Sequence, residues 1–158
     1  MDIFWLEGWD KLDWKQCLIK NVKSISVDIE LIKSLKKTSE NKIISSKELS
    51  LRTETMGSKI SLSYDSVREL LEALAISKGF KIYEHICYTA FLKEIVKHSS
   101  LADEFDELRK IRNDINYYGK DVSLEEAKVV LDRLDKLLKE VKILLEWGWK
   151  TNLISPSK

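Results

Sequence analysis

Apolar residues recur at steps of three and four along most of this chain, which is the spacing of one face of an α-helix. The clearest run follows Ser123 and Glu126, whose spacing predicts a capping box at the start of a helix. The apolar positions of this run are Leu124, Ala127, Leu131, Leu134, Leu138, Val141 and Leu145. The pattern predicts a long amphipathic helix that packs one face inside a helical bundle and ends at Gly148.

A second periodic run extends from Ser24 to about Gly57 and predicts one long helix. Its middle, residues 38–50, could be helix or loop, because its serines and asparagine compete with the helical backbone for hydrogen bonds. Ser66 and Glu69 have capping-box spacing and predict the start of the next helix, which Gly79 kinks or interrupts. Residues 81–97 are apolar nearly all round, which is typical of a helix buried against several neighbours.

Aromatic residues are concentrated at the N-terminus. Residues 1–20 predict a Trp-rich helical segment that closes one end of the bundle, and the alternative is a surface for a partner or for stacking on bases. The residues concerned are Phe4, Trp5, Trp9 and Trp14, with Trp147 and Trp149 as expected companions. Residues 150–158 are expected to form a flexible tail.

The chain contains one proline and five glycines, which favours long helices over many turns. With short connections between the last elements, the patterns predict an all-α protein that folds as an antiparallel up-and-down helical bundle. The length fits a single domain that spans residues 1–158.

The balance of 27 Lys and Arg against 26 Asp and Glu creates no global field that would attract nucleic acid or a membrane surface, so any such contact must be local. Cys17 and Cys87 match no metal spacing and no disulfide framework, which fits a reducing cytosol. No apolar run is long enough to span a bilayer, and the N-terminus lacks the basic start of a secretory signal. We therefore expect a cytoplasmic protein that needs no membrane, metal or cofactor.

Residues 108–119, LRKIRNDINYYG, carry the candidate chemistry. Leu108 and Ile115 belong to a helical stripe that begins at Leu101, and Arg112 lies one turn from both, so this arginine borders the apolar face. Gly119 supplies the left-handed residue that ends the helix. The arginine could reach past the core to a carboxylate on its own or a neighbouring helix, or it could hold an anionic ligand.

The pattern of a penultimate helix that ends in Arg-Asn, a short polar and aromatic run, and one last long helix resembles the HEPN superfamily (higher eukaryotes and prokaryotes nucleotide-binding). The resemblance spans roughly Ser24 to Leu145, and its specific part is RNDINYYG. It implies a HEPN-like fold and, for active members, a metal-independent RNase that works as a dimer. Such RNases are often toxins or CRISPR-associated. Their signature is an arginine with a polar neighbour and a histidine about four to six residues further on.

Arg112 and Asn113 match this signature, whereas Tyr117, Tyr118 and Gly119 occupy the positions of the histidine. A tyrosine has an unperturbed pKa of about 10, so it can bind a phosphate but exchanges no proton near neutral pH. The half of the motif that binds is thus present, and the half that transfers a proton is absent. The candidate catalytic residues are Arg112, Asn113 and Tyr117, and the candidate binding residues are Arg109, Asn116, Tyr118 and His85.

His85 has no helical ligand spacing to Glu84 or His98, so we expect a structural histidine unless the fold brings it to Arg112. Three hypotheses follow, in this order. The first is a HEPN-like binding or partner module without nuclease chemistry, associated with RNA, a nucleotide or a toxin-antitoxin nucleotidyltransferase partner. The second is a metal-independent RNase with a variant site. The third is a purely structural dimerising bundle. The resemblance also implies a homodimer.

Overall fold

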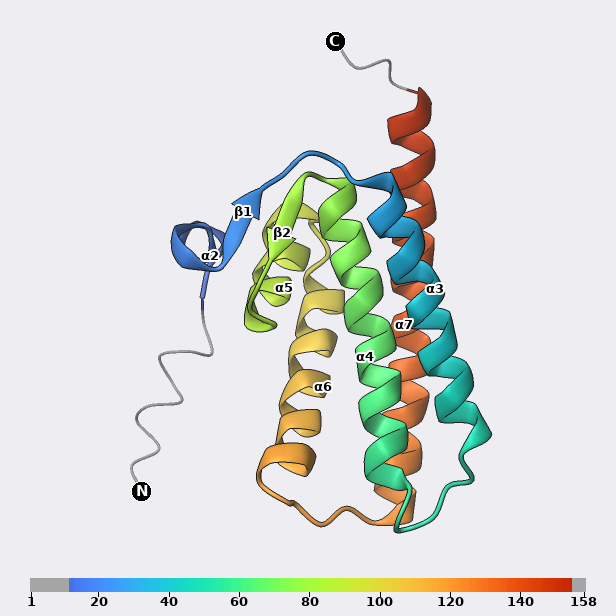
Figure 1. Cartoon of the computed structure of the whole chain (residues 1–158). Helices are drawn as coiled ribbons and strands as arrows, with labels where there is room; N and C mark the ends of the chain where they lie inside the picture. Colours follow the sequence, from blue (N-terminus) through green and yellow to red (C-terminus); the bar gives the residue numbers. More distant parts are fainter. Residues whose placement is uncertain (1–11, 155–158) are drawn as a thin grey trace.

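Four long helices run alternately down and up and form the body of the protein (Figure 1). We analysed a computed structural model, which describes residues 12–154 and the side chains of residues 12–148. The long helices are α3 (Ile29–Glu48), α4 (Met56–Ser77), α6 (Ser99–Tyr117) and α7 (Leu124–Ile154). The short elements are α2 (Trp14–Lys20), β1 (Val22–Ser24), β2 (Phe80–Ile82), α5 (Ile86–Ala90) and a π-helical turn, η1 (Phe91–Ile95). The predicted all-α bundle is confirmed, with the addition of one small two-stranded sheet.

Pairs of buried serines join α3 to α4. The Ser39 hydroxyl donates to the carbonyl of Ser66 at 2.7 Å, and the Ser66 hydroxyl donates to the carbonyl of Ser39 at 2.8 Å. Closer to the end of α3, the hydroxyl of Ser46 lies 2.8 Å from the hydroxyl of Ser63 on α4. These small side chains let the helices pack closely while every hydroxyl is paired. The serine-rich middle of the run is therefore helical as far as Glu48.

The boundaries of this helical pair differ from the prediction. The single helix expected from Ser24 to Gly57 is interrupted after Glu48, and α4 already begins at Met56. Ser66 lies inside α4 and pairs with α3, so its spacing to Glu69 does not mark a capping box. The spacing of a capping box and the spacing of a buried serine pair look alike in sequence, and the tertiary contact decides between them.

Residues 81–97 do not form the single helix that their composition predicts. Gly79 adopts a φ of 86°, which ends α4 and turns the chain into β2. Val22 of β1 pairs with Ile82 in an antiparallel register, so this segment starts as a strand. The predicted burial is confirmed in part, because Tyr88 and Phe91 are at most 1% exposed, whereas Tyr83 is 55% exposed.

Cys17 and Cys87 form a disulfide between α2 and α5, and this corrects the expectation of two free thiols. Both residues are completely buried, and their Cα atoms lie 5.9 Å apart, within the normal range for a disulfide. The partners are separated by 70 residues in sequence. A pairing over that distance depends on the tertiary fold, and the count of two cysteines carried no information about it.

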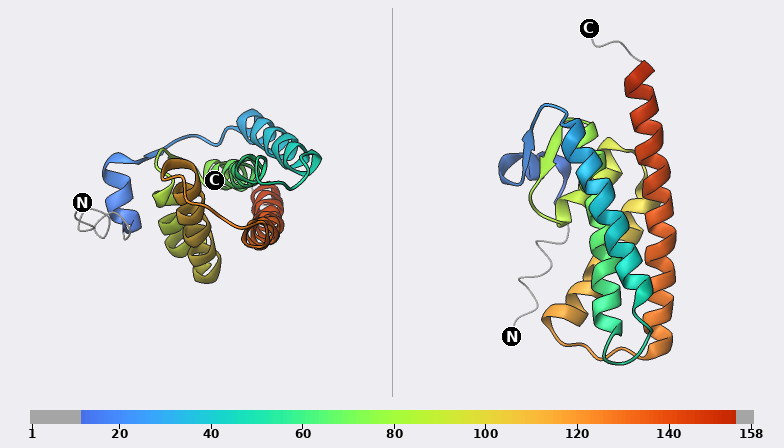
Figure 2. Two further views of the ribbon diagram at one scale, coloured as in Figure 1. Left: turned by 90° about the horizontal axis from the view of Figure 1, so that it is seen from below. Right: turned by 45° about the vertical axis from the view of Figure 1, so that its right-hand side comes forward.

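The short helix α2 lies at the side of the bundle next to β1, as Figures 1 and 2 show. Its Trp14 packs against Phe80 and Phe91, with ring centroids 5.1 and 5.8 Å away. Trp147, one of the expected companions of the N-terminal aromatic residues, is 68% exposed. Phe4, Trp5, Trp9 and the side chain of Trp149 lie outside the described residues.

The last helix, α7, starts as predicted. The amide of Ser123 donates to the Glu126 carboxylate at 3.1 Å, and the amide of Glu126 donates back to the Ser123 hydroxyl at 3.1 Å. The helix continues through Gly148 to Ile154, so neither the predicted end at Gly148 nor a tail from residue 150 is correct. Residues 155–158 lie outside the described part. Within residues 12–154 no helix combines the length and the apolar composition that a bilayer crossing needs.

Candidate anion-binding site

Helix α6 presents Arg112 at the edge of the core, as its sequence predicts. Leu101, Phe105 and Leu108 are buried in one stripe, while Arg112 beside them keeps 13% of its side chain exposed. The helix ends where the carbonyl of Asp114 accepts hydrogen bonds from the amides of Tyr118 and Lys120. Gly119 makes this turn possible with a φ of 59°.

The guanidinium of Arg112 lies between two tyrosine rings. Its central carbon is 4.9 Å from the ring centroid of Tyr64 on α4 and 5.5 Å from that of Tyr117. Nη1 donates to the side-chain oxygen of Asn113 at 3.2 Å and to the hydroxyl of Tyr117 at 3.3 Å. Three of the predicted site residues, Arg112, Asn113 and Tyr117, therefore do lie together.

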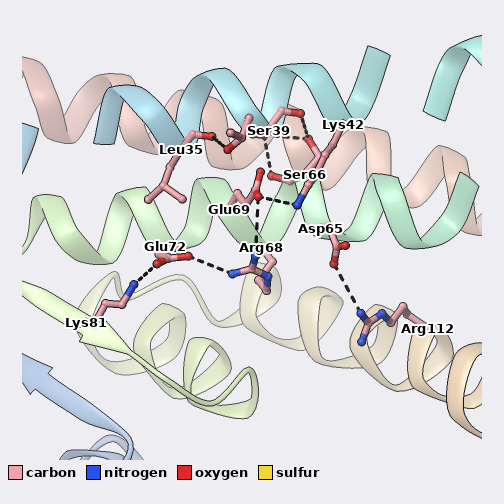
Figure 3. A network of polar contacts seen from close by, with 11 residues as sticks. Leu35, Ser39, Lys42, Asp65, Ser66, Arg68, Glu69, Glu72, Lys81 and Arg112 are labelled. Atoms are coloured by element: carbon pink, nitrogen blue, oxygen red, sulfur yellow. Dashed lines mark hydrogen bonds and ion pairs between the residues drawn. The ribbon is translucent and has the colours of Figure 1, made fainter. Parts of the chain in front are cut away.

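The nearest carboxylate to Arg112 is that of Asp65 on α4, and the contact is long. The Nη2 atom of Arg112 is 3.6 Å from the carboxylate, beyond hydrogen-bond distance but within range of an ion pair (Figure 3). The Nε atom of Arg112 is buried and has no hydrogen-bond partner among the described residues. By contrast, Arg133 donates two hydrogen bonds to Glu104 at 2.7 and 2.9 Å. Arg112 is thus held mainly by ring stacking and an amide, and its hydrogen-bonding capacity is only partly used.

The fold places His85 next to this arginine through Tyr64. His85 precedes α5, and its Nδ1 lies 3.1 Å from the hydroxyl of Tyr64, whose ring carries Arg112 on its face. Tyr64 is completely buried, and burial raises its pKa, so its hydroxyl stays protonated. That hydroxyl has no second acceptor among the described residues, so it donates to Nδ1 and leaves the proton of the neutral imidazole on Nε2.

The surroundings of His85 favour its neutral form. Burial, followed by Arg68, Arg112 and Arg109, lowers the pKa of His85 to about 4. The imidazole at neutral pH is therefore an uncharged hydrogen-bond donor beside three arginines. An imidazole with this pKa is a weak base, because it holds a proton far less readily than an ordinary histidine.

A chain of ion pairs on α4 continues the site toward β2 (Figure 3). Arg68 donates to Glu72 at 3.1 Å, and Glu72 also pairs with Lys81. Next to them, Lys42 of α3 pairs with the buried Glu69 at 2.6 Å. The positive and negative side chains alternate, so any excess of positive charge is local to Arg112 and does not extend along these ion pairs.

The remaining predicted site residues have other surroundings. Arg109 is buried and donates to Asp106 through two nitrogens at 2.9 and 3.1 Å. Asn116 is exposed and exchanges hydrogen bonds with Ser61 of α4. Tyr118 caps the end of α6 and is 71% exposed. The structure therefore gathers Arg112, Asn113, Tyr117 and, through Tyr64, His85, whereas the side chains of Arg109 and Asn116 contact other groups.

Sequence reasoning missed the contribution of α4. Tyr64, Asp65 and Arg68 were hidden in a segment assigned to a loop or to a helix start near Ser66. Their spacing of three and four residues, in a helix that is buried along most of its length, was the available signal, since polar side chains on a buried helix need partners. Tyr88 was noted only as apolar, although burial and Glu72 raise the pKa of its hydroxyl.

Within residues 12–154 no cluster of three or more His, Cys, Asp or Glu side chains could hold a metal ion. The arrangement can bind an oxyanion through the guanidinium of Arg112, and the exposed ring of Tyr117 could stack on a base. Comparisons of the sequence with family models and with curated proteins gave no match.

Proposed function

We propose that the chain is a HEPN-like binding module that holds a phosphate group of RNA or of a nucleotide at Arg112, without nuclease chemistry. The observation that supports this most directly is the long 3.6 Å contact between Arg112 and Asp65, together with the unpaired Nε of Arg112. An arginine that served only as a structural ion pair would be expected to donate short, paired hydrogen bonds, as Arg133 does to Glu104.

The geometry around Arg112 favours an oxyanion, such as a phosphate group, that presents two oxygen atoms to one edge of the guanidinium. Stacking on Tyr64 fixes the plane of the guanidinium, so its edge meets a ligand in one orientation and loses little entropy on binding. The exposed ring of Tyr117 can stack on a nucleobase beside the bound phosphate. His85 adds an uncharged donor on the other side of Tyr64.

The RNase hypothesis is the second candidate, and one observation favours it: a histidine does lie one residue away from Arg112 in space, across Tyr64. The state of that histidine weighs against it. Its Nδ1 accepts from Tyr64 and its pKa is lowered to about 4, so it is poorly suited to take a proton from a 2′-hydroxyl at neutral pH. We therefore rank binding above cleavage.

The test compares Arg112→Ala and Arg112→Lys with the parent in a fluorescent RNA titration at a stated salt concentration. We expect both variants to bind about tenfold more weakly or worse, since a charged hydrogen bond contributes about 1.5–3 kcal/mol and lysine cannot reproduce the planar contact. Arg52→Ala is the matched control, because it removes the same charge from an exposed position in the loop between α3 and α4.

Denaturant melts of the same variants separate binding from structure. Arg112→Ala should cost about 1–2 kcal/mol, the value of a desolvated cation–π contact plus one loosely paired carboxylate. A loss of about 3–5 kcal/mol, as for a broken buried ion pair, in a parent protein that binds neither RNA nor nucleotide, would leave only the structural hypothesis. RNA cleavage by the parent that His85→Gln abolishes would instead establish the RNase.

The disulfide bears on where the protein is located. A cytoplasmic location was expected from free cysteines, and the disulfide weighs against it, because disulfides persist mainly in oxidising compartments outside hyperthermophiles. The resemblance implies a homodimer or a nucleotidyltransferase partner.

A further inference from the structure

A hollow with an apolar floor and an acidic rim lies under the connection between α6 and α7. It measures about 440 Å³, a size typical of pockets that take a ligand or a partner's side chains. The apolar residues that line it, called its floor here, include Ile115, Val122 and Val129, and the acidic residues that line it, called its rim, include Asp114, Asp121 and Glu125. A second hollow of about 700 Å³ adjoins it and shares Ile115 and Val122.

The rim carboxylates lack counterions of their own. No ion pair within the described residues joins Asp114, Asp121 or Glu125 to a lysine or arginine, and Lys120 is the basic residue that lines this hollow. Val129 is 57% exposed although it belongs to the floor. Unpaired carboxylates around exposed apolar side chains suit a ligand that is apolar in the middle and basic at its edge.

The chain itself carries such a surface on α2. Ile19 is 75% exposed and Leu18 is 43% exposed, and Lys15 lies one turn before Ile19 on the same face. Lys20 and Lys23 follow, also exposed, and residues 15–23 contain no acidic residue. Within residues 15–23, the charged side chains near the exposed isoleucine and leucine are therefore all positive.

This surface is held rigidly, although α2 has only seven residues. Cys17 is bonded to Cys87, the amide of Trp14 donates to Glu94 at 2.6 Å, and Asp13 and Gln16 form a capping box. An exposed apolar face on a helix with these constraints cannot turn inward. The constraint lowers the entropy that binding would otherwise cost.

Helix α2 lies at the upper side of the bundle in Figure 1, whereas the connection between α6 and α7 lies at the bottom, so the two surfaces are far apart within one chain. We propose that two copies associate head to tail, with Leu18 and Ile19 of one copy seated in the hollow formed by Ile115, Val122 and Val129 of the next. Lys15 and Lys20 then face the unpaired rim carboxylates. The interface is heterologous, because each copy contributes one knob, formed by Leu18 and Ile19, and one hollow. Further copies can therefore add to the assembly, which forms rings or short chains. The proposal does not depend on the Arg112 site.

The test uses light scattering on the full chain with two exposed substitutions. Ile19→Asp removes the knob and Val129→Asp removes the hollow, while Ile143→Asp is the control, since Ile143 is a comparably exposed apolar residue of α7 at 58%. The parent should exceed the monomer mass of 18.4 kDa as its concentration rises. Each of the first two variants alone should stay monomeric, and Ile143→Asp should associate as the parent does.

An equimolar mixture of Ile19→Asp and Val129→Asp gives the decisive result. One intact hollow and one intact knob remain in the mixture, so its mass should rise to that of a pair and stop there. Circular dichroism checks that both variants are folded. A parent that stays monomeric up to submillimolar concentration, a variant that still associates alone, or a mixture that stays monomeric would each overturn the proposal.

Discussion

Replacing Cys17 and Cys87 by alanine removes the covalent crosslink between α2 and α5. In the chain-entropy description, a crosslink restricts the unfolded chain, and the effect grows with the logarithm of the loop it closes. The two cysteines are 70 residues apart, which corresponds to about 4 kcal/mol at 25 °C. Since a domain of this size is stable by only about 5–15 kcal/mol, the crosslink should account for a large share of the free energy of unfolding.

Urea unfolding measured by tryptophan fluorescence tests this value, with Trp14 next to the crosslink as a reporter. We expect the free energy of unfolding of the double alanine variant to be lower by about 2–4 kcal/mol. This is less than the full value, because measured stabilisation by a disulfide is often smaller than the chain-entropy description gives. Its m-value should rise, since an unfolded chain without the crosslink exposes more surface. A reductant should lower the stability of the parent toward that of the variant and should leave the variant unchanged.

The result that would refute the reasoning is specific. If titration of the unfolded, unreduced parent finds two free thiols, the crosslink does not form and the original expectation for Cys17 and Cys87 was right. If the crosslink forms but parent and variant unfold at the same urea concentration with the same m-value, the restriction of the unfolded chain is not what stabilises α2.

Two further predictions concern buried polar groups. The pKa of His85 is lowered from an unfolded value near 6.5 to about 4. The contribution of the neutral imidazole to the free energy of unfolding should therefore be complete above pH 6.5 and should be lost as the pH falls toward 4. In urea melts, the stability difference between the parent and His85→Gln should shrink over that interval. Ser66→Leu should lower stability by about 1–3 kcal/mol, because Ser66 is fully buried between α3 and α4. Ser66→Ala, which removes only the hydroxyl, should cost about 1 kcal/mol. Equal urea midpoints for the parent and both variants would contradict the close packing of the serine pairs.

The elements that sequence predicted well are those with local signals. The capping box at Ser123, the apolar stripe of α7 and the stripe of α6 that ends at Gly119 all follow from spacings of three or four residues. The position of Arg112 at the edge of the core came from the same stripe. These features could be found because a helix end and a helix face are defined by near neighbours in sequence.

The features that sequence missed depend on partners far along the chain. The strand β2 exists because β1, about 60 residues earlier, supplies its hydrogen bonds, and nothing between Gly79 and Ile82 predicts it alone. The loop between α3 and α4 was missed because it contains no proline or glycine and keeps apolar residues at helical spacing. Thr55 closes this loop by accepting from the amide of Arg52 at 3.0 Å.

One part of the candidate site also depends on local signals, and the other part depends on a partner far along the chain. The second part is the one to which α2 contributes. Arg112 is placed by α6 and by Tyr64 of α4, two long helices that pack against each other without help. His85, by contrast, precedes α5, a helix of five residues that is too short to be stable by itself. What holds α5 is the packing of Tyr88 and the bond from Cys87 to α2. Helix α2, which lies at the side of the bundle and does not close one end as predicted, therefore acts through Cys17 on the part of the site that the long helices do not position.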